Sequence, residues 1–555
     1  MPRPDIPAAK RAGLPVDVER LARDGDDWLS PDERYALKTH GVCTQAQPGV
    51  FMIRVRTAGS LSAEAARGLA GLAEELGKGW VHLTTRQQVE LHHVPARKVP
   101  AALRAVEALG LSTRSTCGHT VRGVMVCPDA GVGLDEPFDC TPDAAAAGRW
   151  LHTRHRQLDT QLPQRLNVAF GGCPACRDHA RLNDVAFVST LADGGGPAYE
   201  LWAGGSLGKS QPTLAVRIPG TVARRDVVAA LDALVAVFVA HGDFDKPGRA
   251  RMKYLLAELG QDDFLSLYQA AFREARALDH PDPEPVELPT ATAITEILST
   301  APQGGWSAGL RPQRTPGRAL VSVAVPLGDL DDRELRQLAE LALRHGDGRL
   351  HLTRNQDLNL RDVAVSEMSA VRERLSAMGL TLVGDDGASQ VRCCTGGPVC
   401  ALAITPSASV GALLLSSPAL ARNASLRVSI SGCPNACAQH QVADIGFSGG
   451  KVTVAGASVL GYQVWLGGDL GAGRVGAVIG RVADRDVPAI TEAIVGLWES
   501  LRASAETLAE TVERVGAAGF AAHVGRVCDG RWAIGPEPEP DLLAVDRTLP
   551  LAVLS

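Results

Sequence analysis

The chain carries the same succession of motifs twice, and this repeat limits its possible folds more than any other feature. "HLTTRQQVEL", residues 82–91, and "HLTRNQDLNL", residues 351–360, align without a gap and share five of ten residues. Two further motif pairs follow in the same order, residues 167–188 with 427–448 and residues 201–208 with 464–471. Chance explains three ordered recurrences poorly, so we predict two related halves.

The sequence in front of each "HLT" motif predicts the same local structure in both halves. Residues 50–80 and 319–349 each indicate a strand, a glycine turn, an amphipathic helix and a second strand. In the second copy Asp331 and Glu334 have the spacing of a helix capping box. In the first copy Gly77 stands where a helix C-cap glycine belongs.

Length and composition indicate a multidomain globular protein. A chain of 555 residues exceeds what one hydrophobic core normally covers, so we expect two to four domains. The acidic, proline-rich residues 279–289 are typical of a linker between the halves. The residues from Cys528 onward match neither half, and we expect them to form a tail.

The net charge and the hydropathy of the chain limit the kinds of molecule that it can bind. The net charge of −6 argues against nucleic acid, which usually requires a basic surface. It does not exclude a small anion, because a few converging arginines can create a local positive pocket. No apolar run follows the basic residues at the N-terminus, and no apolar segment is long enough to span a bilayer. We therefore expect a cytoplasmic protein that binds neither nucleic acid nor membrane.

Four of the twelve cysteines form two tight pairs in the second half. Cys394 and Cys400 are separated by five residues, and Cys433 and Cys437 by three. Cytoplasmic cysteines are better read as metal ligands, reactive thiols or small buried residues than as disulfides. Four thiolates can hold a zinc ion or an iron–sulfur cluster.

The residues between these cysteines favour the cluster. The five-residue spacing is wide for zinc, whose paired ligands are mostly two to four residues apart. Glycine and proline in "TGGPV" and "PNA" keep side chains clear, so that the backbone can wrap a bulky cluster and bond its sulfurs. Zinc and unmetallated core cysteines remain the alternatives.

The combined motifs resemble the sirohaem-containing sulfite and nitrite reductases. The likeness rests on the two cysteine pairs, "GCPNACAQH" and "HLTTRQ", and it runs from about Tyr35 to about Phe520. It implies a [4Fe–4S] cluster bound by Cys394, Cys400, Cys433 and Cys437. In that family the last cysteine, here Cys437, also bridges to the sirohaem iron. Asn435 in the same motif is expected to contact the cofactor, whereas Cys393 lies outside the pattern.

The resemblance also assigns an anion pocket. "FMIRVR" contributes Arg54, "CGHTVRG" contributes Arg122, and "LPQRLNVAF" contributes Arg165 and Asn167 as the residues at the substrate. Arginine suits this role because it stays charged and its planar fork matches an oxyanion. The family commonly has two lysines where this chain has Arg165 and Asn167, so one charge is kept and one is lost.

Sirohaem carries many carboxylates, which also need basic partners. The resemblance implies that Arg86 contacts one of these carboxylates, with His92 nearby on the same strand face. Ala46 stands where the family often has arginine, so the number of basic groups around the pocket is smaller than usual.

The first half has its own cysteines near the matching motif. Cys173 and Cys176 lie in "GGCPACRDH", and Cys117 and Cys127 lie upstream. In the family this counterpart of the cluster site is normally degenerate. We therefore expect relics or small buried residues there, and a second metal site is the alternative.

The resemblance implies an α/β (α+β) fold with two pseudo-symmetric halves. Two ferredoxin-like segments would pair into one domain, and two larger mixed domains would clamp the sirohaem and the cluster. The expected segments are an N-terminal extension (1–34), ferredoxin-like repeat 1 (35–110), a sirohaem and anion-binding domain (111–278), a linker (279–314), ferredoxin-like repeat 2 (315–385), a [4Fe–4S] and sirohaem domain (386–527) and a C-terminal tail (528–555).

The function that the resemblance implies is the six-electron reduction of sulfite to sulfide or of nitrite to ammonia. We find no flavin or nicotinamide domain, so the electrons would come from ferredoxin or from a separate reductase subunit. Two alternatives remain. A precorrin-3B synthase-like enzyme of cobalamin biosynthesis would share the cluster motif, and a non-catalytic iron–sulfur electron carrier would leave the arginines without a role.

Overall fold

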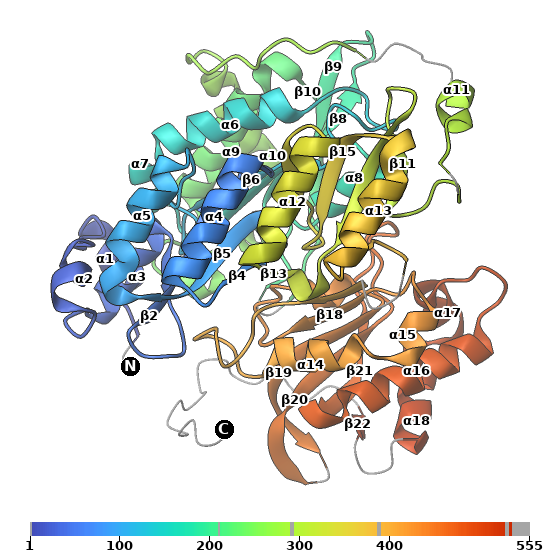
Figure 1. Ribbon diagram of the computed structural model, residues 1–555. Helices are drawn as coiled ribbons and strands as arrows, with labels where there is room; N and C mark the ends of the chain where they lie inside the picture. Colours follow the sequence, from blue (N-terminus) through green and yellow to red (C-terminus); the bar gives the residue numbers. More distant parts are fainter. Residues whose placement is uncertain are drawn as a thin grey trace.

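The computed structural model describes residues 3–208, 211–288, 294–302, 304–385, 390–454, 456–527 and 532–534. In these residues the strands form four sheets (Figure 1). The same described residues include no helix with both the length and the apolar character needed to cross a membrane.

Two sheets form the predicted paired domain. The first has the order β1-β2-β5-β4-β13 and the second has the order β11-β12-β15-β14-β3, with β16 added beside β12. The strands are β1 (Val42–Thr44), β2 (Val50–Arg56), β3 (Ser60–Ser62), β4 (Trp80–Leu83), β5 (Gln88–Pro95), β11 (Leu310–Pro312), β12 (Arg318–Ala324), β13 (Asp329–Asp331), β14 (Arg349–Leu352), β15 (Leu358–Ala364) and β16 (Thr381–Leu382). The halves exchange strands, because β13 pairs with β4 and β3 pairs with β14, both antiparallel.

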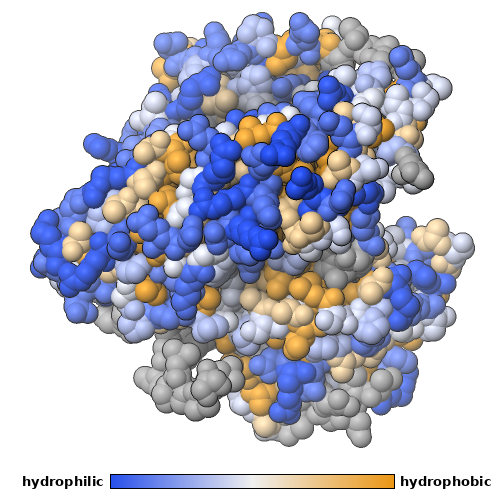
Figure 2. All heavy atoms as spheres, viewed as in Figure 1, coloured by the Kyte–Doolittle hydropathy of each residue, from blue (hydrophilic) through white to orange (hydrophobic). Residues whose placement is uncertain are grey.

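One hydrophobic core joins these two sheets. The helices α4 (Ala63–Leu76) and α12 (Asp332–His345) pack against each other, and α5 (Val99–Ala108) and α13 (Met368–Ala377) complete the layer. Buried residues of both halves belong to the same core cluster. Figure 2 shows that the outward face over α4 and α12 is largely hydrophilic, as amphipathic helices require.

The local signals read from the sequence are confirmed. Asp331 accepts a hydrogen bond from the Glu334 N–H, and Glu334 caps Asp331 in return. Gly77 is the C-cap residue of α4. Its requirement for glycine is steric, since a Cβ at this position would lie 2.7 Å from the His92 carbonyl oxygen.

The two larger domains share one topology. Each begins with three parallel strands and continues with antiparallel ones, in the orders β6-β7-β8-β9-β10 and β17-β18-β19-β20-β21-β22. The strands are β6 (Val121–Met125), β7 (Leu166–Gly171), β8 (Val185–Leu191), β9 (Pro197–Ala203), β10 (Val216–Ala223), β17 (Val391–Cys393), β18 (Val428–Ser431), β19 (Ile445–Val454), β20 (Ala457–Leu466), β21 (Ala477–Ala483) and β22 (Trp532–Ile534).

Helices cover these sheets. In the first half they are α6 (Thr141–Thr153), α7 (His155–Gln161), α8 (Pro174–Ala180), α9 (Val227–His241) and α10 (Met252–Ala275). In the second half they are α14 (Ser407–Leu414), α15 (Pro418–Arg422), α16 (Val487–Leu501), α17 (Leu508–Val515) and α18 (Ala517–Val527). Each domain has its own core, and the mixed α/β fold of two related halves agrees with the expectation.

Three predicted boundaries differ from the structure. Helix α3 (Pro31–Ala36), which follows α1 (Ile6–Arg11) and α2 (Arg20–Asp24), crosses the expected boundary after residue 34. The expected linker 279–314 contains α11 (Ile294–Ser299) and β11, which already pairs with β12. The expected tail contributes β22 to the sheet of the second half, beside β21. The remainder of 528–555 lies outside the described residues.

Candidate functional site

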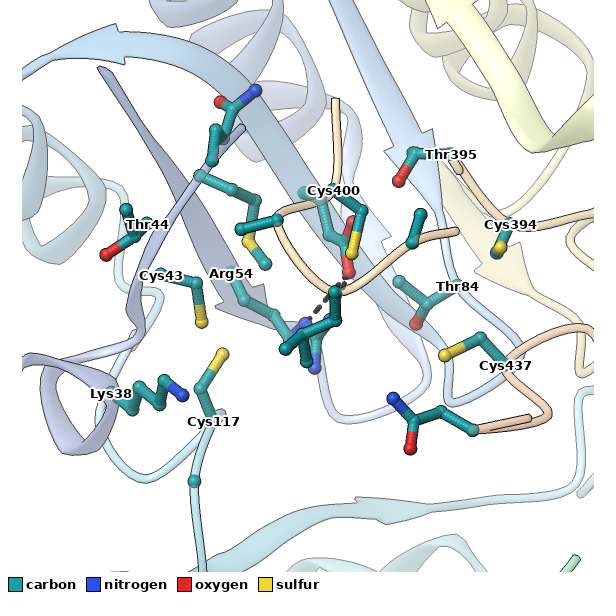
Figure 3. A pocket seen from close by; sticks show the side chains of 18 of the residues that line it. Lys38, Cys43, Thr44, Arg54, Thr84, Cys117, Cys394, Thr395, Cys400 and Cys437 are labelled. Carbon is teal, nitrogen blue, oxygen red and sulfur yellow. Dashed lines mark hydrogen bonds and ion pairs between the residues drawn. The ribbon is translucent and has the colours of Figure 1, made fainter. Parts of the chain in front are cut away.

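A cavity of about 970 Å³ opens where the paired domain meets the two larger domains (Figure 3). Strands β2 and β5, the loop after β4 and the two cysteine loops of the second half contribute to its wall. All predicted site residues except Asn167 line it, namely Arg54, Arg86, His92, Arg122, Arg165, Cys394, Cys400, Cys433, Asn435 and Cys437.

The cysteine loops follow two adjacent parallel strands, β17 and β18, and therefore meet at one sheet edge. The Gly432 N–H donates to Cys394 Sγ at 3.2 Å, and Ser407 Oγ lies 3.3 Å from the same sulfur. Gly396 permits this approach, because a Cβ at its position would lie 2.1 Å from Ser407 Oγ. Gly396 is therefore required by the packing of this loop against Ser407, and room for a cluster stays a prediction.

Three of the four thiols are costly to ionise without a positively charged partner. Burial raises the pKa of Cys394 to about 12, and the neighbouring Cys437 adds to the rise. Burial and the other sulfurs also raise the pKa of Cys400 and of Cys433. Thiolates in this place need a positively charged partner. The four sulfurs do not all lie within 4.8 Å of one another, as they would around a single ion. The donor set therefore fits a cluster better than zinc.

Arg54 is held by a carboxylate that the sequence analysis did not identify. It forms an ion pair with Glu90 (Figure 3), and its Nε donates to Glu90 Oε1 at 3.0 Å. Burial would raise the pKa of Glu90, but Arg54 and His92 outweigh it and hold the pKa well below its usual range. Glu90 therefore neutralises part of the positive charge that Arg54 brings to the cavity.

The other arginines leave an excess of positive charge. Burial lowers the pKa of Arg122 to about 10. Burial and the charges of Arg251, Arg122 and Arg86 lower the pKa of Arg165 well below its usual value. The Nε atoms of Arg122 and Arg165 are buried without a partner. These groups fit a ligand that carries several negative charges, as sirohaem and an oxyanion do.

Asn167 lies outside the cavity wall, whereas His92 is part of it. The Asn167 Oδ1 accepts a hydrogen bond from Arg86 Nε at 3.3 Å. Asn167 therefore contacts Arg86 beside the cavity, and its place at the substrate stays a prediction. His92 lines the cavity, stacks on Trp80 with ring centroids 4.7 Å apart, and places Nε2 3.1 Å from Glu90 Oε2.

Two further cysteines line the cavity. Cys43 was not considered as a site residue, and Cys117, grouped by sequence with Cys127, Cys173 and Cys176, lies here rather than with those three. The thiols of Cys43 and Cys117 face each other beside Arg54 (Figure 3). The hydrogen bond from Cys43 is the largest cause that lowers the pKa of Cys117 to about 6. Cys43 lies on β1 and Cys117 in a loop before β6, so no local spacing could have indicated the pair.

The loop after β4 also ties the two halves together at the site. Thr85 Oγ1 donates to the Cys437 carbonyl oxygen at 2.8 Å. The "HLTTRQ" motif of the first half therefore ends at the cofactor cavity, as expected, and positions the loop of the second half.

Family models match most of the chain. The nitrite and sulphite reductase 4Fe-4S domain matches residues 117–275 and 386–529. The nitrite/sulfite reductase ferredoxin-like half domain matches residues 44–109 and 311–378. Both models match twice, once in each half.

Characterised proteins are similar over nearly the whole length. A sulfite reductase [ferredoxin] of Mycobacterium tuberculosis is 30% identical over 497 residues, which are 83% of this chain and 85% of that protein. A ferredoxin–nitrite reductase of Leptolyngbya laminosa is 30% identical, with 86% and 92% covered. The structure of the Mycobacterium tuberculosis NirA protein superposes with a TM-score of 0.81 at 27% identity and covers 94% of this chain and 98% of that one.

Proposed function

This chain belongs to the nitrite and sulphite reductase family, and we propose that it catalyses the six-electron reduction of sulfite to sulfide or of nitrite to ammonia. As a member it is an oxidoreductase whose cofactors are a [4Fe–4S] cluster and sirohaem. The observation that carries the proposal is one cavity in which four cysteines meet several arginines, two of which, Arg122 and Arg165, have a buried Nε without a partner.

The cofactors divide the cavity between them in this proposal. Cys394, Cys400, Cys433 and Cys437 hold the cluster, and Arg86, oriented by Asn167, pairs with a carboxylate of sirohaem. When bound, the tetrapyrrole and the cluster supply the electron-transfer chemistry. His92 and Asn435 complete the cofactor wall.

The substrate anion is held by Arg54, Arg122 and Arg165. Their guanidinium groups attract its oxygens and polarise the S–O or N–O bonds toward cleavage. The reaction also consumes protons, and Asn167 replaces a family lysine that could supply one. The Cys117 thiol lines the same cavity, and its pKa, lowered to about 6, lets it exchange a proton there just below neutral pH.

Sulfite is the substrate that we expect to be preferred. It offers three oxygens and up to two negative charges, whereas nitrite offers two oxygens and one charge. A cavity with several guanidinium groups and one neutralising carboxylate matches the larger charge better. A ferredoxin is the proposed electron donor, since similar proteins are named for that donor.

The test combines a spectrum with an anaerobic assay. Purified protein should show sirohaem and cluster absorption and should reduce sulfite, and nitrite more slowly, with a reduced dye. Cys437→Ser should remove the cluster signal and the turnover. Cys393→Ser is the matched control, because Cys393 is buried beside the site but lies outside the ligand set. A cluster spectrum without a tetrapyrrole band would contradict the proposal and favour the synthase alternative.

A further inference from the structure

Three thiols of the first half meet in a buried group outside the cavity described above. Cys127 follows β6, Cys173 precedes α8, and Cys176 lies in the first turn of α8. Their sulfurs all lie within 4.8 Å of one another, and those of Cys127 and Cys173 are 3.4 Å apart. In the part of the chain that the structure describes, no other set of three or more potential metal ligands is this compact.

The spacing of these sulfurs matches one metal ion. With a zinc–sulfur bond of about 2.3 Å, two sulfurs on the same tetrahedral ion lie about 3.8 Å apart. Soft thiolates select Zn²⁺ and Cu⁺ over harder cations. We propose that Cys127, Cys173 and Cys176 bind a single thiophilic ion, Zn²⁺ or Cu⁺, at a site separate from the cluster.

The group occupies the place that the cluster has in the other half. Gln87 Nε2 donates to the Val126 carbonyl oxygen at 2.7 Å, and its repeat counterpart Gln356 donates to the Cys393 carbonyl oxygen at 2.9 Å. Since Cys127 follows Val126 as Cys394 follows Cys393, these two cysteines are counterparts.

A second contact of the same two loops indicates that Cys176 and Cys437 are also counterparts. Arg354 Nη1 lies 3.4 Å from the Cys176 carbonyl oxygen, and its repeat counterpart Thr85 donates to the Cys437 carbonyl oxygen. The cysteines of the first half therefore stand at positions equivalent to ligands of the cluster site. Their sulfurs, however, lie close enough together to bind a single ion.

The surroundings suit an anionic metal–thiolate group. Three thiolates with Zn²⁺ or Cu⁺ carry a net negative charge, which burial would penalise without cationic neighbours. Arg354 is buried and donates to the Phe170 carbonyl oxygen at 2.9 Å, and its charge acts on Cys127 and Cys176. The Asp129 N–H donates to Cys127 Sγ, a contact that would orient a ligating sulfur.

One buried carboxylate lies beside the thiol group. Glu136 is 3% exposed, and its Oε2 has no partner. It flanks the group, since a Cβ on Gly172, which precedes Cys173, would lie 3.1 Å from Glu136 Cβ. No Glu136 oxygen belongs to the compact group, so the three sulfurs are its donor set; three sulfurs suffice for Cu⁺, whereas Zn²⁺ normally takes four ligands.

The experiment uses the complete enzyme expressed with added zinc and copper. Elemental analysis should find one zinc or copper ion per chain in addition to iron. X-ray absorption at the edge of that metal should show three sulfurs at about 2.3 Å. Protein that contains iron alone, or a metal surrounded by oxygen and nitrogen, would overturn the inference.

Variants test the ligands. Cys173→Ala with Cys176→Ala should lose the ion while iron content and cluster absorption stay unchanged. Cys140→Ala is the matched control, because Cys140 is equally buried in the same core but is not one of the three. Retention of the ion in the double variant would exclude the site. If that variant fails to fold, the absorption data on unaltered protein still decide. Reductase turnover depends on the other cysteines, so failure of either proposal is recognisable separately.

Discussion

Arg165 brings a buried positive charge to the cavity with its Nε unpartnered. Arg165→Met keeps much of the side-chain volume but removes this charge. A hydrogen bond to a charged group contributes about 1.5–3 kcal/mol, so kcat/KM for sulfite should fall about ten- to a hundred-fold. Arg249→Met, at an exposed arginine of the same half, should leave kcat/KM unchanged. A comparable fall in both variants would contradict the proposed role.

Cys117 should react as an acidic thiol. The thiolate is the nucleophile, and the pKa of Cys117 is lowered to about 6, so its alkylation should rise as pH increases through about 6 and fall below it. Cys43→Ala removes the largest cause of the lowered pKa and should move this midpoint upward. Peptide mass spectrometry after brief alkylation across pH 4–10 measures both midpoints (~pH 6 for the unaltered protein). An identical midpoint in the two proteins would disprove the Cys43 contribution.

The sequence predicted residues with local spacing and missed those joined by distant strands. The four cysteines predicted to bind the cluster follow two strands and have a distinctive spacing, whereas Glu90 and Cys43 have none. Asn167 was assigned to the substrate by its motif, but the structure places it against Arg86. A motif predicts the strand or loop on which a residue lies, whereas the packing determines which neighbour its side chain contacts.

Two glycines at helices should respond in opposite ways to alanine. Gly496 lies inside α16 with open space around a Cβ, so Gly496→Ala should stabilise the protein by about 0.5–1 kcal/mol. Gly77→Ala should destabilise it, because the new Cβ would meet the carbonyl oxygens of His92 and Ala73 at 2.7 and 3.0 Å. Urea unfolding midpoints of the two variants measure the difference, and a shared direction would contradict the steric account.

At the scale of elements, the strand–turn–helix–strand repeat was predictable because its apolar periodicity is long. The exchanged strands β3 and β13 and the added strand β22 have three residues each, too few to show a period. Their pairing depends on tertiary contacts, which explains why β22 was not expected within the tail.

The two halves should remain associated after the chain is cleaved between them. Residues 279–288 carry no helix or strand, and Glu287 and Leu288 are exposed. A protease site inserted between these two residues should give two fragments that coelute and retain sulfite reduction, because they share one core and exchange β3 and β13. Size-exclusion chromatography after cleavage provides the measurement. Separation of the fragments in native buffer would contradict the role of the exchange.

The pairing of the halves followed from the repeat and the cavity between them from the family resemblance, but the charge balance inside that cavity did not. The similarity of the two repeats indicates a pseudo-twofold arrangement of the halves. The charge in the cavity depends instead on which side chain stands at each pair of equivalent positions. Thr85 and Arg354 illustrate this, since counterpart residues face a cofactor cavity in one half and a closed thiol group in the other.

The exchanged strands also impose an order on biosynthesis. Strand β4 receives its neighbour β13 only when the ribosome has reached Asp331, long after the rest of the first sheet is complete. Until then the nascent chain exposes an unpaired strand edge, which is prone to associate with other chains. Translation speed across the second half and chaperone protection of this edge should therefore govern the yield of assembled protein in the cell.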